Sequence, residues 1–329
     1  MKTVLVTGGA GFIGSHLCEK LVLKGYKVIS VDSFNDYYSP KLKRNNIQEI
    51  IDTITIDGLD AKSFLSVEGD IRDLSLLQSV FSIHDIDTVV HLAAYAGVRP
   101  SICNPALYYD VNIVGTMNLL EVLKKYGIKK LVFASSSSVY GNNEKLPFCE
   151  DDIVDSPISP YAASKKSGEL MCHVYHHLYN INTACLRFFT VYGPRQRPDL
   201  AIRKFTELIL NDREISVYGD GSTERDYTFI SDIIDGIVKS IDWIQSDQSK
   251  FDIFNLGESK TISLLEMIAT IEKAIGKKAK KNNHPEQEGD VKKTFADIKK
   301  AKNVLGYNPS TEFEEGIKVF VDWLLKSRL

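Results

Sequence analysis

The chain has 329 residues, of which 43% are hydrophobic and 25% are charged, as is ordinary for a globular protein of one or two domains. Forty basic and forty-three acidic residues give a formal net charge of −3, which argues against nucleic acid as a partner. Five cysteines without a C-x-x-C pair favour reduced thiols. We find no secretory leader, and no apolar stretch approaches the ~20 residues of a membrane helix, so we expect a cytoplasmic protein without membrane contact.

Short apolar runs alternate with segments of helical periodicity through the first 190 residues. The predicted strands are 4–7, 28–32, 64–67, 88–94, 131–135 and 184–189, and the predicted helices are 17–24, 74–81, 111–126 and 162–179. Continuous apolar strands between helices indicate an α/β fold, with a doubly wound parallel sheet of the Rossmann type. Such a sheet binds its ligands at the carboxyl ends of its strands.

The pattern changes after about residue 190, where proline, arginine and aromatic clusters interrupt shorter elements. We therefore predict a nucleotide-binding domain over 1–190 and a smaller C-terminal α/β substrate domain over 191–329. A helix and a strand within about 228–256 are expected to return to the first sheet.

A glycine-rich loop follows the first strand directly. Gly8, Gly11 and Gly14 lie between that strand and the next helix, where backbone without Cβ can approach a pyrophosphate and the helix N-terminus attracts its charge. A P-loop is excluded, because Ser15-His16 stands where Lys-Ser/Thr is required. Asp32 ends the second strand, where a carboxylate binds the adenosine ribose diol and repels the 2′-phosphate of NADP. The loop and Asp32 together predict NAD.

Later strand ends supply the other predicted cofactor contacts. Residues 69–73 follow the third strand where an adenine ring would lie, and 91–95 end the fourth with small residues that suit close passage of a cofactor. Arg44 is the residue that leaves open whether the cofactor is NADP rather than NAD. Besides the glycines and Asp32, the predicted cofactor-binding residues are Phe12, Ile13, Asn35, Asp70, Ile71, Leu92, Ala93, Ala94, Asn112, Ser135, Tyr161, Lys165 and Phe188.

A serine run and a Tyr-x-x-x-Lys pair form the candidate catalytic site. Tyr161 and Lys165 share one face of the helix that begins at Pro160. A free tyrosine has a pKa of ~10, and a neighbouring ammonium together with a cationic nicotinamide ring would lower that pKa. Ser136 can hydrogen-bond the same substrate hydroxyl. This set suits removal of a proton from an alcohol while hydride leaves the same carbon.

With these motifs the sequence resembles the extended short-chain dehydrogenases/reductases, specifically the NAD-dependent nucleotide-sugar epimerases and dehydratases. The resemblance implies bound NAD, a UDP- or dTDP-sugar between two domains, and a homodimer paired through helices 111–126 and 162–179. In that family the serine or threonine three places before the valine of Val-Tyr-Gly is catalytic, which is Ser136 here. Tyr161 and Lys165 match the family's base and its partner.

The positions directly before Val-Tyr-Gly favour epimerisation. Related dehydratases carry Asp-Glu there and uronate decarboxylases usually a glutamate, whereas this chain has Ser137 and Ser138 and so no evident second acid/base. Residues 187–205 and 96–99 resemble UDP-glucuronate 4-epimerases, and neutral-sugar epimerases usually have asparagine at the Thr190 position. We therefore predict conversion of UDP-glucuronate to UDP-galacturonate through a 4-keto intermediate. A 4-epimerase of neutral UDP-sugars, a uronate decarboxylase and a non-catalytic NAD sensor remain as alternatives.

The resemblance also implies substrate-binding residues. One group is expected to surround the C6 carboxylate of the sugar: Ser137, Ser138, Thr190 and Arg197. Binding of the pyrophosphate alone is an equally weighted alternative for the arginine. A second group resembles the family's uracil, phosphate and ribose contacts: Val217, Tyr218, Arg225 and Asp290. Arg99 and Ser136 complete the predicted substrate site.

Histidines on the helix over 162–179 raise the question of a metal site. His173 and His177 have the i, i+4 spacing of zinc ligands, but Val174 stands where His-Glu-x-x-His requires glutamate. We therefore predict no metal and assign these histidines to a helix surface or dimer face.

Overall fold

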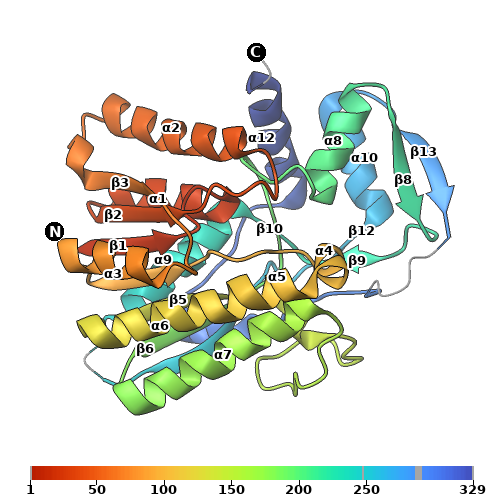
Figure 1. The fold of residues 1–329 in the computed structure, drawn as a ribbon. Helices are drawn as coiled ribbons and strands as arrows, with labels where there is room; N and C mark the ends of the chain where they lie inside the picture. The colour runs from red at the N-terminus through yellow and green to blue at the C-terminus, as the bar shows by residue number, and fades with distance from the viewer. Residues whose placement is uncertain (1, 247, 286–290, 328–329) are drawn as a thin grey trace.

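The computed structural model describes residues 2–246, 248–285 and 291–327, and a seven-stranded parallel sheet forms its centre (Figure 1). Its strands are, in spatial order, β11 (Phe251–Leu256), β6 (Asn182–Phe188), β5 (Lys130–Ser136), β4 (Thr88–His91), β1 (Thr3–Thr7), β2 (Lys27–Asp32) and β3 (Phe64–Glu68). The strand order reverses between β4 and β1, so ligands are expected at the carboxyl ends of these two strands. The predicted doubly wound α/β fold is confirmed.

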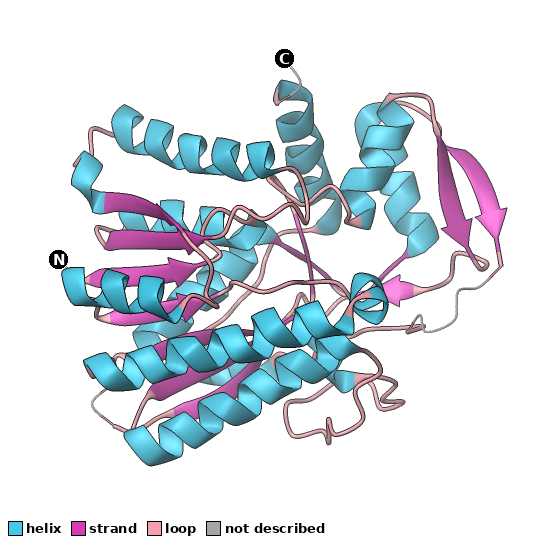
Figure 2. Cartoon of the chain, viewed as in Figure 1, coloured by secondary structure: helices cyan, strands magenta, loops and turns pink. Residues whose placement is uncertain are grey.

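Helices cover both faces of the sheet (Figure 2). The elements of one face are α1 (Phe12–Leu23), α2 (Pro40–Ile56) and α9 (Ile230–Ile244), and those of the other are α3 (Leu74–Ile83), α6 (Gly115–Tyr126) and α7 (Pro160–Tyr179). Along β1, the side chains of Val4 and Val6 pack in the hydrophobic core on the side of α1, while Leu5 packs in the core on the side of α3. Both faces of the strand are therefore apolar, because each has a helical layer to pack against.

Strand β4 is shorter than the sequence predicts. Its pairing ends at His91, which lies opposite Thr7 of β1 and Phe133 of β5, and β1 turns into the glycine loop after Thr7. The predicted continuation to residue 94 is therefore wrong. His91 contacts the hydroxyl of Thr7 through Nδ1 at 2.6 Å and that of Thr116 through Nε2 at 2.9 Å. Its ring stays neutral, since burial lowers the pKa to about 3.

Shorter elements follow β6, and in Figure 1 several of them lie beside the carboxyl ends of the sheet. They are β7 (Thr190–Tyr192), α8 (Ala201–Leu210), β8 (Glu214–Tyr218), β9 (Glu224–Arg225), β10 (Tyr227–Phe229), β12 (Ile262–Ser263), α10 (Leu264–Ile275), β13 (Lys280–His284), α11 (Lys299–Leu305) and α12 (Phe313–Lys326). Strand β11 pairs with β6 at the edge of the main sheet. The division into domains over 1–190 and 191–329 stays a prediction.

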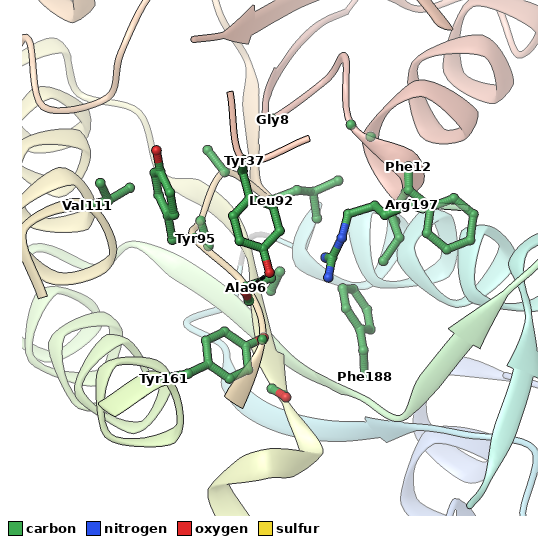
Figure 3. Close-up of a pocket in the computed structure, with 18 of the residues that line it drawn as sticks. Gly8, Phe12, Tyr37, Leu92, Tyr95, Ala96, Val111, Tyr161, Phe188 and Arg197 are labelled. Carbon is green, nitrogen blue, oxygen red and sulfur yellow. Dashed lines mark hydrogen bonds between the residues drawn. The ribbon is translucent and has the colours of Figure 1, made fainter. Parts of the chain in front are cut away.

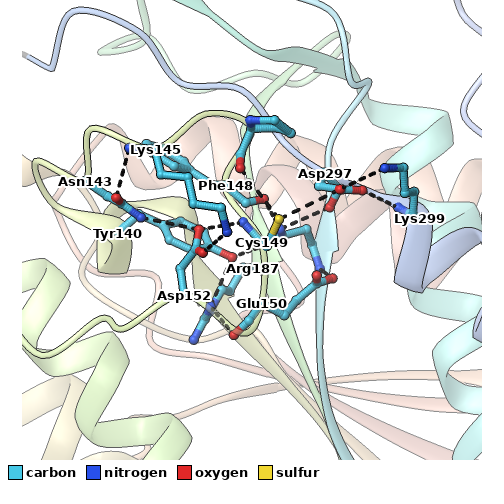
Figure 4. Close-up of polar contacts among 12 residues, drawn as sticks. Tyr140, Asn143, Lys145, Phe148, Cys149, Glu150, Asp152, Arg187, Asp297 and Lys299 are labelled. Atoms are coloured by element: carbon cyan, nitrogen blue, oxygen red, sulfur yellow. Dashed lines mark hydrogen bonds and ion pairs between the residues drawn. The ribbon is translucent and has the colours of Figure 1, made fainter.

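Polar contacts that meet at Asp152 and Arg187 hold the connection between β5 and α7 (Figure 4). Asp152 pairs with Lys145 and accepts a hydrogen bond from the backbone N–H of Cys149 at 2.8 Å. Arg187 donates to the hydroxyl of Tyr140 at 3.0 Å. This connection leads from the serine run into the helix of the Tyr-x-x-x-Lys pair, so these contacts help to fix both.

Within residues 2–246, 248–285 and 291–327, no helix is both long and apolar enough to cross a membrane. The same ranges contain no group of three His, Cys, Asp or Glu side chains that could hold a metal ion. The ring of His173 instead packs edge-on against Phe251, with 4.8 Å between ring centroids.

Candidate functional site

A cavity of about 470 Å³ lies at the carboxyl ends of the central strands, with its lining drawn from the loops that follow them (Figure 3). Its volume is in the usual range for a small-molecule site. Residues predicted for the cofactor and substrate that line it are Gly8, Gly11, Phe12, Ile13, Gly14, Asp32, Asn35, Asp70, Ile71, Leu92, Ala93, Ala94, Ser135, Ser136, Ser137, Ser138, Tyr161, Lys165, Phe188, Thr190 and Arg197.

The glycine loop forms a cradle that a side chain would fill. A Cβ on Gly14 would lie 2.1 Å from the carbonyl oxygen of Gly8, and one on Gly8 would lie 2.8 Å from the amide nitrogen of Ala93. Gly8 also has a φ of +72°, which favours glycine. Helix α1 begins directly after Gly11 without a side-chain cap, and its first turn faces the cavity. The cradle and the helix N-terminus together fit a dinucleotide pyrophosphate.

Asp32 presents a buried carboxylate at the end of β2. Its oxygens accept hydrogen bonds from the backbone N–H of Ala10 at 3.1 Å and of Phe34 at 2.9 Å. Burial raises the pKa of this carboxyl group, and the hydrogen bonds and the Lys43 charge oppose that shift. Arg44, which left NADP open, forms a 3.1 Å ion pair with the exposed carboxylate of Glu68. These contacts favour NAD over NADP.

Helix α7 presents Tyr161 and Lys165 to the cavity from its first two turns. The helix begins in place because Ser159 accepts a hydrogen bond from the backbone N–H of Ala162 at 3.1 Å. The ammonium of Lys165 donates to the carbonyl of Ala134 at 2.7 Å and lies 6.0 Å from the centroid of the Tyr161 ring. Burial lowers the pKa of Lys165 to about 8.

The electrostatics around Tyr161 differ from the expectation that a neighbouring ammonium lowers its pKa. In the protein alone, burial raises the pKa of Tyr161, while a hydrogen bond with Ser136 and the positive charge of Arg197 act in the opposite direction. In Figure 3, Tyr161 and Arg197 extend into the cavity from opposite sides. Arg197 is thus an electrostatic partner of Tyr161 that the sequence did not reveal.

A pair of tyrosines that the sequence analysis missed supports the same cavity. The hydroxyls of Tyr37 and Tyr108 both donate to the carbonyl of Ala96, each at 2.7 Å. The Tyr37 ring also lies 5.4 Å from the guanidinium of Arg197. The available signal was that Tyr37 stands next to Tyr38 in the loop after the second strand and Tyr108 next to Tyr109, but nothing local distinguishes these residues from surface aromatics.

Several predicted residues do not line the cavity. Asn112 is buried behind it and donates to the carbonyl of Tyr95 and the hydroxyl of Ser164, each at 2.9 Å. Val217 is buried in the core. Arg225 donates to the carbonyl of Glu224 at 2.9 Å.

Arg99 and Tyr218 meet each other outside the lining. The guanidinium of Arg99 lies 5.9 Å from the centroid of the Tyr218 ring, which stacks on His284 with 5.1 Å between ring centroids. Asp290 lies outside the described residues. The substrate roles of these side chains stay predictions.

Comparison with known proteins identifies the family. The sequence model of the GDP-mannose 4,6 dehydratase family matches residues 5–320, nearly the whole chain. The chain belongs to this family. The predicted membership of the extended short-chain dehydrogenases/reductases is confirmed.

Other family members are similar over almost their whole length. An uncharacterized protein of Methanocaldococcus jannaschii is 47% identical over 99% of this chain and 97% of its own. A UDP-glucuronate 4-epimerase of Thermodesulfobacterium geofontis is 43% identical over 98% of this chain and 96% of its own. The crystal structure of UDP-glucuronic acid 4-epimerase from Bacillus cereus in complex with UDP-glucuronic acid and NAD superposes with a TM-score of 0.89, at 38% identity and 99% coverage of both chains.

His16, in the first turns of α1, is expected to make stability depend on pH. Its Nε2 lies 2.9 Å from the carbonyl of Pro194, and burial, helped by the charge of Arg195, lowers its pKa to about 4. An unfolded histidine titrates near pH ~6.5. Between these two pKa values the unfolded state therefore binds a proton that the folded state does not bind. As a result, stability is lost as the pH falls from about 6.5 towards 4.

The variant His16→Gln keeps a donor for Pro194 but does not titrate. Urea unfolding at pH 7.5 and 4.5 should show the wild type losing about 2 kcal/mol more than this variant on acidification. Equal losses in the two proteins would show that His16 titrates normally in the fold.

Proposed function

We propose that this enzyme interconverts UDP-glucuronate and UDP-galacturonate by inverting C4 of the sugar with bound NAD. The observation that carries the proposal is the lining of the cavity beside Tyr161. There Ser137, Ser138 and Thr190 offer hydroxyls, and Arg197 offers a guanidinium, to a sugar carboxylate. The named 4-epimerases among the relatives and the UDP-glucuronic acid bound in the Bacillus cereus structure support this substrate.

The cofactor would be held by the glycine cradle, with Asp32 on its adenosine ribose. When bound, NAD accepts a hydride from C4 and returns it. Tyr161, as phenolate, takes the proton of the C4 hydroxyl and later gives it back. Ser136 hydrogen-bonds the C4 oxygen and orients it. The positive charge of Arg197 favours the phenolate against the cost of its burial.

The carboxylate site also has to prevent a side reaction. Oxidation of a uronate at C4 gives a β-keto acid, which loses CO₂ most readily when the C5–carboxylate bond lies perpendicular to the ketone plane. Ser137, Ser138 and Thr190 can hold the carboxylate away from that geometry through hydrogen bonds. As hydroxyls they supply no strong acid to protonate an enolate.

The test uses purified protein without added NAD. It is incubated separately with UDP-glucuronate and with UDP-glucose, and the anomeric protons of the sugars are followed by NMR. We expect UDP-galacturonate from the first sample alone. UDP-galactose from the second would transfer the assignment to neutral sugars, and a pentose product would identify a decarboxylase.

We also propose a cytoplasmic homodimer that pairs through α6 and α7. Apolar side chains on these two helices are 44–57% exposed, namely Met117, Leu170, Val174 and Leu178. Such a patch is typical of a protein interface. All five cysteines are free, as suits a reducing compartment. Sedimentation velocity should show a dimer that Val174→Asp dissociates, and a monomeric wild type would refute the pairing.

A further inference from the structure

The segment 193–197 connects the substrate side of the cavity to the helices beside the cofactor loop. Arg197, at its end, points into the cavity (Figure 3). Arg195, two residues earlier, has a φ of +60° and is almost wholly buried. A residue other than glycine adopts this backbone conformation only where its surroundings hold it.

Carboxylates from two different helices hold Arg195. Its Nε donates to Oε2 of Glu49 on α2 at 2.5 Å, and its Nη1 lies 2.8 Å from Oε2 of Glu19 on α1. Glu19 is itself fixed, because it accepts a hydrogen bond from the hydroxyl of Thr53 at 2.7 Å. The planar guanidinium can bridge two carboxylates in this way, whereas the single ammonium of a lysine cannot hold the same geometry.

The backbone of the segment is anchored on either side of Arg195. The carbonyl of Pro194 lies 2.9 Å from Nε2 of His16, which is neutral at pH 7 and can donate there. The carbonyl of Gln196 accepts a hydrogen bond from Arg203 of α8 at 2.5 Å. Helix α1, which carries His16, begins at the glycine cradle, so the segment is fixed to the element that would hold the pyrophosphate.

Arg197 is placed where an anionic substrate would need it. Its guanidinium lies 5.4 Å from the centroid of the Tyr37 ring and makes two hydrogen bonds to Asp199, at 3.0 and 2.8 Å. Its charge also acts on Tyr161. A shift of the segment would therefore displace a charge that faces both the substrate and the base.

We propose that Arg195 is a positioning residue for substrate binding, which fixes Arg197 by fastening the 193–197 segment to α1 and α2. The inference rests on the proposed function in that it takes the substrate to be an anionic UDP-sugar. Without the two-carboxylate contact, Arg197 has more conformations to lose when substrate binds, so affinity falls. Once bound substrate holds Arg197 in place, its charge acts on Tyr161 as in the wild type. Tyr161, Ser136 and Lys165 stand on other elements, so the chemical step changes little.

The experiment compares Arg195→Lys with the wild type. The variant keeps the charge but not the bridge, and we expect the KM for UDP-glucuronate to rise about tenfold with kcat within about twofold. The NAD content of the purified protein, read from its absorbance after denaturation, should not change. Arg213→Lys, the same substitution at an exposed arginine, is the matched control and should leave KM as it is.

A second variant keeps the inference falsifiable if Arg195→Lys folds poorly. Glu49→Gln removes one carboxylate charge and leaves the ion pair between Arg195 and Glu19, so its KM should rise by a smaller factor of about three. An unchanged KM in both variants would overturn the proposal. So would a fall in kcat together with NAD content, since that pattern means that Arg195 only supports α1. If the wild type shows no turnover, the proposed function is refuted. Calorimetry then compares the dissociation constants of UDP-glucuronate for the wild type and for Arg195→Lys, and an unchanged constant would overturn the proposal about Arg195.

Discussion

Replacement of Tyr161 by phenylalanine is expected to lower the rate of C4 epimerisation by at least about a thousandfold, equivalent to ~4 kcal/mol in the barrier. The hydroxyl is the only group that this change removes, and in the proposed mechanism it carries the proton of the substrate alcohol. The glycine cradle and Asp32 lie on β1, α1 and β2, away from α7, so bound NAD should be retained.

Two measurements on the same preparation check this result. NMR of the anomeric protons gives the turnover, and the absorbance of the denatured protein gives the NAD content. Tyr126→Phe is the matched control, because it removes a hydroxyl that donates to the carbonyl of Gln78 at 3.0 Å, outside the cavity lining. Full activity in Tyr161→Phe would remove Tyr161 from the mechanism.

The variant Glu169→Gln is expected to lower the free energy of unfolding by about 3 kcal/mol, because it leaves a buried arginine without its counter-charge. Both side chains of the Glu169–Arg187 pair are 1% exposed, and Nε and Nη2 of Arg187 donate to the two carboxylate oxygens at 2.8 and 2.9 Å. Glu169 also accepts a hydrogen bond from the hydroxyl of Ser135 at 2.6 Å. The substitution therefore also loosens the end of β5, where the serine run begins.

Urea unfolding at pH 7.5 measures the loss. Glu314→Gln, which removes an exposed partner of Lys273 and Lys318, is the control and should unfold as the wild type does. If Glu169→Gln were as stable as the wild type, the charge of Glu169 would contribute nothing to the free energy of unfolding beyond the hydrogen bonds that an amide also makes.

Much of the sheet and its cofactor end could be predicted from sequence because the relevant patterns are local. The glycine spacing after the first strand, Asp32 at the end of the second and the i, i+4 pair on α7 each lie within one loop or helix. The end of β4 could not be predicted in this way. Residues 92–94 are apolar or small like a strand, but β1 turns into the glycine loop after Thr7, and the pairing with β5 also ends at His91.

The sequence by itself determined the α/β fold, because apolar periodicity reflects contacts between near neighbours in the chain. Its motifs, by their resemblance to a known family, determined the family and the candidate catalytic set of Ser136, Tyr161 and Lys165. Only the tertiary structure decided what surrounds that set. It brought Arg197 and Tyr37 to the same cavity. It also placed the phenol of Tyr161 where burial raises its pKa and the charge of Arg197 lowers it. These contacts join residues more than thirty positions apart, and their energies depend on how much water the assembled fold excludes, which no local pattern records.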